Sequence, residues 1–227
     1  MPEIYHVLSR GVDKRKMFMD DRDRFRFIHD LYEFNDQENV RDNSYLFNIR
    51  DVRHNDIGRV DEKRPRKLLV NILAFCLMPN HYHLLLRPLV DKGMSLFMKK
   101  LNGGYVKYFN NKYERTGTLF ERRYKSILVN NESHFIHLPY YIHFNPLDLI
   151  APEWRKGKLR NYQKALDFLN SYRWCSHSDY MGKKNFPSVT QRSFLLKVFG
   201  GEKGYEQKIT SWLKDLNVEK ISDIMLE

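Results

Sequence analysis

The chain has 227 residues, of which 14% are aromatic, and it carries a formal net charge of +11 at pH 7. This length suffices for one large domain or a domain with an appendage, and the aromatic content excludes extensive disorder. No apolar run reaches the roughly 18 residues needed to cross a membrane, and residues 1–6 lack the basic and apolar regions of a secretory signal. We therefore expect a cytoplasmic protein with no membrane partner.

The two cysteines, Cys76 and Cys175, are too few and too far apart in the sequence to indicate a disulfide framework. Cys76 lies in an apolar segment, so we expect a buried thiol there. This cysteine usage agrees with a cytosolic location.

The first part of the chain is expected to begin with a strand over residues 4–12. A helix follows, capped by Asp20 or Asp21 and running to about residue 34. Residues 35–66 are polar and rich in Asn, Asp and Arg, so we interpret them as an inserted loop with at most a short strand at 45–49.

Two further strands are expected at residues 67–78 and 81–88, separated by a turn at Pro79 and Asn80. A helix at 94–110 and a strand at 122–129 come next. The last helix of this region begins after Asn130 or Asn131 and must end at residue 144, because Pro146 disfavours helical geometry at Asn145.

This order of strands and helices predicts an α+β fold with a ferredoxin-like (βαββαβ) antiparallel sheet and helices on one side. We assign the core to residues 1–150, including the insert at 35–66. Residues 151–227 are helical in pattern and polar, and we expect them to form a C-terminal extension.

His81 and His83 stand two residues apart on the strand expected at 81–88. Alternate residues of a strand point to the same face, roughly 6.5–7 Å apart, so both imidazoles can reach one metal ion. Taken alone, such a pair is more often the result of chance or core packing than a metal site. A metal-free structural role for both histidines therefore stays open.

Basic residues outnumber acidic ones by 39 to 28, which favours a polyanionic partner. Eight of them lie between residues 99 and 125, against two acids, with six Phe and Tyr residues interleaved. Cations for phosphates and flat rings for bases suit a single-stranded nucleic acid. The alternative is a helix whose rings face the core and whose lysines are solvated, which the four-residue spacing of Phe97, Leu101, Tyr105 and Phe109 favours for part of the set.

The helix that ends before Pro146 places His137, Tyr141 and Asn145 on one face, whereas Tyr140 and His143 point elsewhere. A tyrosine hydroxyl is a poor nucleophile unless a cation or a base draws off its proton. A divalent ion held by the two histidines would polarise a phosphate oxygen, and Asn145 would add an oxygen ligand. The alternative for Tyr141 is a half-buried helix residue whose hydroxyl is hydrogen-bonded.

Three blocks occur in order along the chain: CLMPNHYHLLL at residues 76–86, GTLFERRYK at 117–125 and YIHFNPL at 141–147. Together they resemble the single-tyrosine HUH transposases, the IS200-like and REP-associated group. Residues 5–11 and 172–176 are similar to the opening strand and the post-catalytic segment of that group. The resemblance covers roughly residues 4–180 with one interruption.

The resemblance implies a metal-dependent endonuclease and strand transferase that acts on single-stranded DNA with hairpin structure. His81 and His83 correspond to the ligands of Mg²⁺ or Mn²⁺, and Asn145 is the candidate third ligand. Tyr141 corresponds to the nucleophile that leaves a 5′-phosphotyrosyl link and a free 3′-hydroxyl. Relatives occur as monomers and as dimers with exchanged helices, so the resemblance leaves a homodimer open.

The hairpin is expected to dock on five basic residues: Arg10, Lys107, Arg122, Arg123 and Lys125. Arg122 stands where relatives usually carry a small Gly. Pro139 lies inside the catalytic helix and should kink it or mark its first turn. The segments 35–66 and 185–227 have no counterpart in the family.

Two other functions compete with this interpretation. A domesticated or inactive relative would bind structured DNA or RNA without cutting it. A metal-dependent hydrolase would use water as its nucleophile, so Tyr141→Phe would keep cleavage, whereas a tyrosine nucleophile predicts loss of the covalent adduct. The presence of all four site residues, His81, His83, Tyr141 and Asn145, favours the active enzyme.

Overall fold

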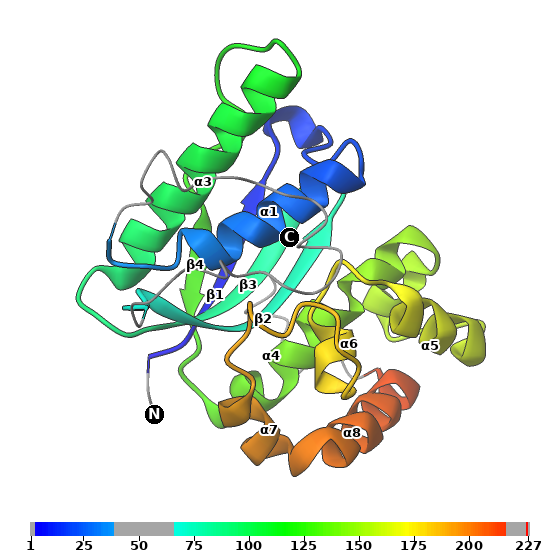
Figure 1. Ribbon diagram of the computed structural model, residues 1–227. Coiled ribbons are helices and arrows are strands. Elements are labelled where there is room, and N and C mark those ends of the chain that lie inside the picture. The colour runs from blue at the N-terminus through cyan, green and yellow to red at the C-terminus, as the bar shows by residue number, and fades with distance from the viewer. Residues whose placement is uncertain (1–2, 39–65, 217–225, 227) are drawn as a thin grey trace.

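A computed structural model describes residues 3–38, 66–216 and 226 of the chain. Most of the insert expected at 35–66, including the short strand at 45–49, lies outside the described residues. Within them, four strands form one antiparallel sheet in the order β2-β3-β1-β4 (Figure 1). The strands are β1 (Tyr5–Arg10), β2 (Val70–Met78), β3 (His81–Pro88) and β4 (Lys125–Leu128).

Helices follow the strands in the order that the sequence predicts. They are α1 (Asp21–Glu33), α3 (Gly93–Lys112), α4 (Glu132–Phe144), α5 (Tyr162–Ser171), α6 (His177–Tyr180), α7 (Ser193–Phe199) and α8 (Gly201–Asp215), with short 3₁₀ turns η1 (Val12–Lys14), η3 (Asn145–Leu149) and η4 (Pro152–Lys156). The α+β class and the antiparallel sheet are confirmed. The helices of the C-terminal extension are present as expected.

Capping residues set the starts of α1 and α4. The Asp20 side chain accepts a hydrogen bond from the backbone of Asp23 at 3.0 Å, and Asn131 caps α4 in the same way. The helix α4 ends at Phe144, as Pro146 dictates. It begins a full two turns before Pro139 and continues through it, so the expectation that Pro139 marks the first turn is wrong.

The last strand is shorter than the sequence suggests. Arg122 and Arg123 lie in a bend outside the strand, and β4 begins only at Lys125. Arg123 therefore lies outside the strand, which the sequence predicts at 122–129, and Lys125 is its first residue.

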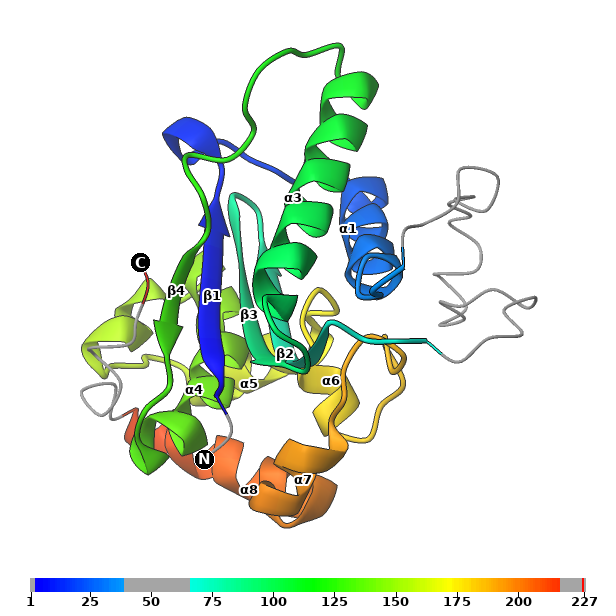
Figure 2. The same ribbon diagram turned by 90° about the vertical axis from the view of Figure 1, so that its left-hand side faces the viewer.

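Both faces of the sheet are covered. The side chains of Tyr82, Leu84 and Leu86 on β3 pack with α1 and α3 in one hydrophobic cluster. Leu85, which points to the opposite face, packs with α4 and the C-terminal helices in a second cluster. Figure 2 shows the sheet edge-on between these layers. The expectation of helices on one side holds for α1 and α3 but not for α4.

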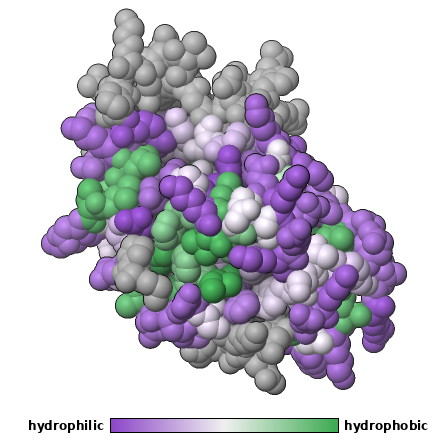
Figure 3. Space-filling view, turned by 90° about the horizontal axis from the view of Figure 1, so that it is seen from below, coloured by the Kyte–Doolittle hydropathy of each residue, from purple (hydrophilic) through white to green (hydrophobic). Residues whose placement is uncertain are grey.

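The second cluster joins the two halves of the chain. It contains Leu73 and Leu85 from the sheet together with Trp154, Tyr205 and Trp212 from beyond residue 150. Seen from the side of these C-terminal helices, the surface is mainly hydrophilic, with apolar side chains near its centre and in further patches toward its sides (Figure 3). The division at residue 150 stays a prediction.

No helix among the described residues has the length and apolar character required to cross a membrane.

Candidate active site

Three histidines lie on the face of the sheet that α4 covers. The register pairs Leu8 of β1 with His83 of β3, and His6 lies on the same face two residues before Leu8. The rings of His6 and His83 stack with centroids 5.2 Å apart, and His81 meets His83 edge-on at 5.0 Å. The expectation that His81 and His83 share one face of β3 is confirmed by this geometry.

Each histidine of the pair has its Nδ1 atom held by a neighbour. The Nδ1 of His83 lies 2.9 Å from the Nε2 of His6, and the Nδ1 of His81 lies 2.7 Å from the amide oxygen of Asn80 in the turn. Metal-binding histidines commonly use one ring nitrogen for the metal and the other for such a partner. In this arrangement Nε2 is the nitrogen of each ring that would bind a metal ion.

The donor set fits a divalent ion in part. Two imidazoles lie on one strand with their rings in contact. Imidazole nitrogens are ligands that divalent ions bind in proteins. Among the described residues, no three His, Cys, Asp or Glu side chains come together as a metal-binding group. Further ligands would therefore be an amide oxygen, water or substrate.

Tyr141 lies directly over the histidines. Its ring centroid is 5.9 Å from that of His6 and 5.9 Å from that of His83, edge-on to both. Tyr141 lies on the buried face of α4, so its side chain points from the helix onto the sheet. Tyr141 has no exposed surface. The structure thus brings together the tyrosine and the histidine strand that the sequence separates by 58 residues (141 − 83).

The hydroxyl of Tyr141 accepts a hydrogen bond from Nη1 of Arg155 at 3.0 Å. Asn145, also fully buried, donates from its amide to the backbone oxygen of Tyr141 at 2.9 Å and accepts from Nη2 of Arg155 at 2.9 Å. Asp148 in turn accepts from Nε and Nη2 of the same guanidinium at 2.8 and 2.7 Å. Tyr141 of α4 and Asn145, the first residue of η3, are therefore both hydrogen-bonded to one arginine.

The neighbouring aromatic residues of α4 point away from the histidines. Tyr140 packs against Tyr205 and Trp212 of α8, and burial raises the pKa of its hydroxyl. His137, which was expected on the face of Tyr141, stacks instead on Trp212 at 5.5 Å. Of the two adjacent tyrosines, only Tyr141 is in contact with the histidine strand.

The sequence did not indicate Arg155. It lies in η4, ten residues beyond Asn145, in a segment with no motif, and it meets Tyr141 because η4 packs against η3. His6 belongs to the opening strand that resembles the family, yet only the register of β1 against β3 reveals its contact with His83.

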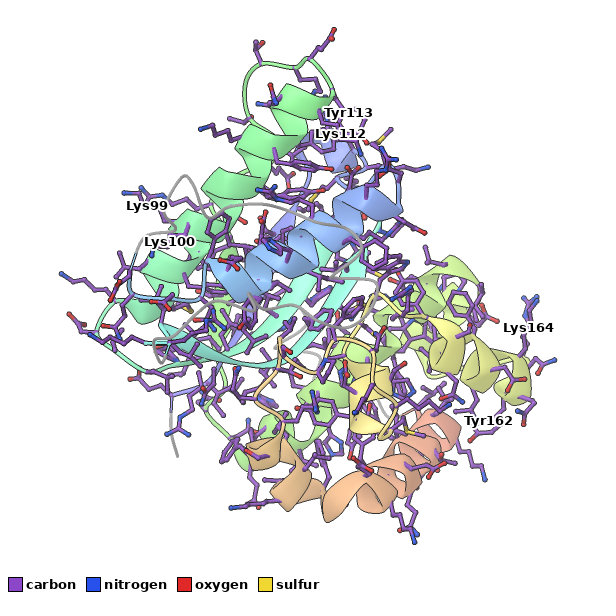
Figure 4. The ribbon with its side chains drawn as sticks, in the orientation of Figure 1. Lys99, Lys100, Lys112, Tyr113, Tyr162 and Lys164 are labelled. Carbon is purple, nitrogen blue, oxygen red and sulfur yellow. The ribbon has the colours of Figure 1, made fainter. Side chains whose placement is uncertain are left out.

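The basic residues fall into two groups. Arg122 and Arg123 line a groove of about 1000 Å³ between α3 and the segment before β4, together with Lys99, Phe120 and Tyr124. Lys99 projects from α3 on the side away from the C-terminal helices (Figure 4). A groove with cations and two aromatic rings suits a nucleic-acid strand.

The second group lies on the histidine face. Arg10 is paired with His81, and Lys125 is paired with Leu8, so both side chains point to the face of His83. Lys107 is exposed on α3 but does not line the groove. The single docking cluster expected from the sequence is thus divided between the two faces of the sheet.

A protein-family model matches the part of the chain that holds these residues. The family model described as "Transposase IS200 like" matches residues 50–145, a range that includes His81, His83, Tyr141 and Asn145. A solved structure described as "Structure of the REP associates tyrosine transposase bound to a REP hairpin" is similar at 14% identity, with 85% of this chain and 89% of that chain covered and a TM-score of 0.46. No curated protein matches the chain.

Proposed function

We propose, from the match of residues 50–145 to the IS200-like transposase family, that the chain is a metal-dependent endonuclease and strand transferase acting on single-stranded DNA. The observation that carries the proposal is the contact of Tyr141 with His83, at 5.9 Å between ring centroids. A tyrosine beside a pair of imidazoles supplies a nucleophile and a metal site at one place.

His81 and His83 would hold the Mg²⁺ or Mn²⁺ ion. When bound, the ion supplies positive charge that polarises a phosphate oxygen of the substrate. Asn145 is the proposed third ligand. Its amide oxygen accepts from Arg155, and a carbonyl oxygen has a second lone pair with which it can bind a cation.

In the proposed reaction, the phenol oxygen of Tyr141 attacks the phosphorus of a phosphodiester. One O–P bond forms to the tyrosine, and the bond from phosphorus to the 3′-oxygen breaks. The phenolic proton is lost to the surroundings and the departing 3′-oxygen gains one, which leaves a 5′-phosphotyrosyl link and a free 3′-hydroxyl. Attack of a 3′-hydroxyl on the same link reverses these steps and joins strands.

Access to Tyr141 requires movement. The side chain has no exposed surface, and Trp154 packs on its ring at 5.9 Å. The proposal therefore includes a displacement of the covering side chains when DNA binds. Such steps commonly precede chemistry in enzymes whose sites exclude water.

The DNA partner is proposed to carry a hairpin and to occupy both basic groups. Arg122 and Arg123 in the groove would contact one part of the strand, and Arg10 and Lys125 would guide the backbone across the histidine face. Exposed Lys107 would add a phosphate contact on α3. Contacts of this kind are sequence-independent, so they position the DNA rather than select it.

We also propose that the sheet and its helices have the ferredoxin-like topology. The βαββαβ order of elements and the sheet order β2-β3-β1-β4 support it. In this arrangement the histidine strand β3 lies between β2 and β1, where α4 can cover it.

A suicide assay tests the function. The protein is incubated with Mn²⁺ and single-stranded hairpins from the DNA that flanks its gene, and the covalent product is detected by denaturing electrophoresis and mass spectrometry. We expect a phosphotyrosyl adduct at Tyr141, lost in Tyr141→Phe and in the double variant His81→Ala/His83→Ala. Tyr140→Phe is the matched control and should keep the adduct.

The second candidate function is DNA or RNA binding without cleavage, which the complete burial of Tyr141 favours. It predicts hairpin binding with no adduct under any metal condition. Cleavage that persists in Tyr141→Phe would instead favour a hydrolase with water as its nucleophile.

A further inference from the structure

Arg155 is held in one orientation by its own neighbours. The carboxylate of Asp148 accepts from two of its nitrogens at 2.8 and 2.7 Å, and the same carboxylate accepts from the indole of Trp154 at 2.7 Å. Such a paired contact fixes the plane of a guanidinium as well as its position. The side chain is only 20% exposed, so solvent competes little with these bonds.

The segment that carries Arg155 is anchored in the core. Trp154 has no exposed surface and packs against the rings of Tyr141 and Phe144 at 5.9 and 6.0 Å. Arg155 lies over the indole of Trp154, 4.8 Å from its centroid. The guanidinium is thus part of a rigid arrangement and not a surface side chain that happens to reach the site.

The same guanidinium also donates to Tyr141 and Asn145, with Nη2 shared between Asn145 and Asp148. Nη1 donates to the hydroxyl oxygen of Tyr141 at 3.0 Å, and Nη2 donates to the amide oxygen of Asn145 at 2.9 Å. A guanidinium does not lose its proton in proteins, so Arg155 cannot act as a base. It can only donate, and a donated bond strengthens as the acceptor oxygen becomes more negative.

We propose that Arg155 is a catalytic residue of the nicking reaction, which holds the attacking oxygen of Tyr141 against the histidine face and stabilises the charge on that oxygen. The proposal rests on the function proposed above. Asp148 is the positioning residue that aims the guanidinium. Because the same arginine also contacts Asn145, it couples the nucleophile to the proposed third metal ligand.

The test measures the rate of adduct formation with Mn²⁺ and a hairpin single strand. Removal of one donor to a reacting oxygen typically costs about 100- to 1,000-fold in rate. We expect a loss of this size in Arg155→Ala, a smaller loss in Arg155→Lys, and faster adduct formation by Arg155→Ala when millimolar methylguanidinium is added. Arg160→Ala is the matched control, because Arg160 follows η4 in the chain and its side chain is 92% exposed.

Rescue by methylguanidinium separates a chemical role from a structural one, because a small cation cannot repair a misfolded loop. Adduct formation by Arg155→Ala at the wild-type rate would overturn the inference. A slow Arg155→Ala variant that methylguanidinium does not accelerate, together with an equally slow Arg155→Lys, would overturn it as well. If the wild-type protein forms no adduct, the proposed function itself fails, whereas the other outcomes leave that function in place.

Discussion

The Nε2 atom of His6 lies 2.9 Å from the Nδ1 atom of His83, across the antiparallel pair of β1 and β3. A neutral His83 that binds a metal through Nε2 carries its proton on Nδ1, and this N–H can donate a hydrogen bond to Nε2 of His6. The contact therefore fixes both the tautomer and the orientation of the proposed ligand. Both side chains are fully buried, so water does not replace this bond.

His6→Phe removes the acceptor while a flat ring of similar size remains. We expect the affinity for Mn²⁺ to fall by about 10- to 100-fold, the usual cost of losing a partner of a metal-bound histidine. The measurement is a titration that follows unbound Mn²⁺ by electron paramagnetic resonance. Tyr5→Phe is the control, because Tyr5 is adjacent on β1 but points to the opposite face. Unchanged Mn²⁺ affinity in His6→Phe would contradict this role of His6.

The helix starts and the histidine strand could be predicted because local chemistry decides them. Asp20 and Asn131 cap their helices through their own side chains, and the alternation along β3 puts His81 and His83 on one face. The covered second face of the sheet was indicated too, by the continuous apolar run of β2 (Val70–Met78). The apolar run does not show which helix covers that face, so the position of α4 could not be predicted from it.

The contacts of Arg155 and His6 could not be predicted in this way. Each depends on two segments that are distant in sequence and meet only through the packing of the whole fold. Arg155 reaches Tyr141 because Trp154 is buried beside Phe144. No periodic pattern in residues 152–156 predicts this packing. Spacing along one element can predict a face, but not which other element covers it.

The groove residues Arg122 and Arg123 should contribute to the salt dependence of DNA binding. Each phosphate contact on a single strand contributes roughly 0.7 to the slope of log affinity against log salt. We expect Arg122→Ala/Arg123→Ala to weaken hairpin binding and to reduce this slope by up to about 1.4. Fluorescence anisotropy over a salt series measures both.

Lys164→Ala is the control for the groove variant, since Lys164 projects from α5 away from the sheet (Figure 4). It should leave the slope and the affinity close to those of the wild-type protein. A slope in Arg122→Ala/Arg123→Ala equal to the wild-type slope would show that the strand does not follow the groove.

The two cysteines, remote in sequence, are directly opposite each other in the fold. Cys76 and Cys175 form an antiparallel bridge flanked by backbone bonds from Leu77 to Trp174 at 2.8 Å and from Ser176 to Phe75 at 3.0 Å. This pattern makes them a pair without mutual hydrogen bonds, in which Cα atoms are about 4.5 Å apart. That separation lies within the range that disulfides span.

Oxidised glutathione should therefore convert the pair to an intramolecular disulfide by two exchange steps, slowly because both thiols are buried. We expect a mass loss of two hydrogens and a higher melting temperature, with a gain in the free energy of unfolding of up to about 4 kcal/mol. Cys175→Ala should show neither change. A stable glutathione adduct as the main product would contradict the predicted pairing.

Two buried histidines link α4 to the C-terminal helices. Tyr205 lies between them, with its hydroxyl 2.7 Å from Nδ1 of His143 and 2.8 Å from Nδ1 of His177. The other nitrogens meet the hydroxyl of Ser176 at 2.8 Å and the amide oxygen of Asn170 at 3.1 Å. The network is satisfied when both rings are neutral, since each then has one donor and one acceptor.

Protonation of either ring would place a charge in this interior. Burial lowers the pKa of His143 well below its ordinary value, with the nearby His177 as a second cause. Burial, and secondarily the charge of Lys183, lowers the pKa of His177 to about 4. In the unfolded chain both histidines titrate near 6.5, so the unfolded state takes up protons first as the pH falls.

The contribution of these histidines to stability is complete above pH 6.5 and decreases as the pH falls toward 4. We expect the free energy of unfolding to decrease by about 1.4 kcal/mol per pH unit for each buried histidine in this window. Urea unfolding at a series of pH values measures the slope, which His177→Gln should reduce by one such contribution. The network holds α4, and with it Tyr141. A slope that is the same in His177→Gln as in the wild-type protein would mean that carboxylates elsewhere in the chain govern acid unfolding.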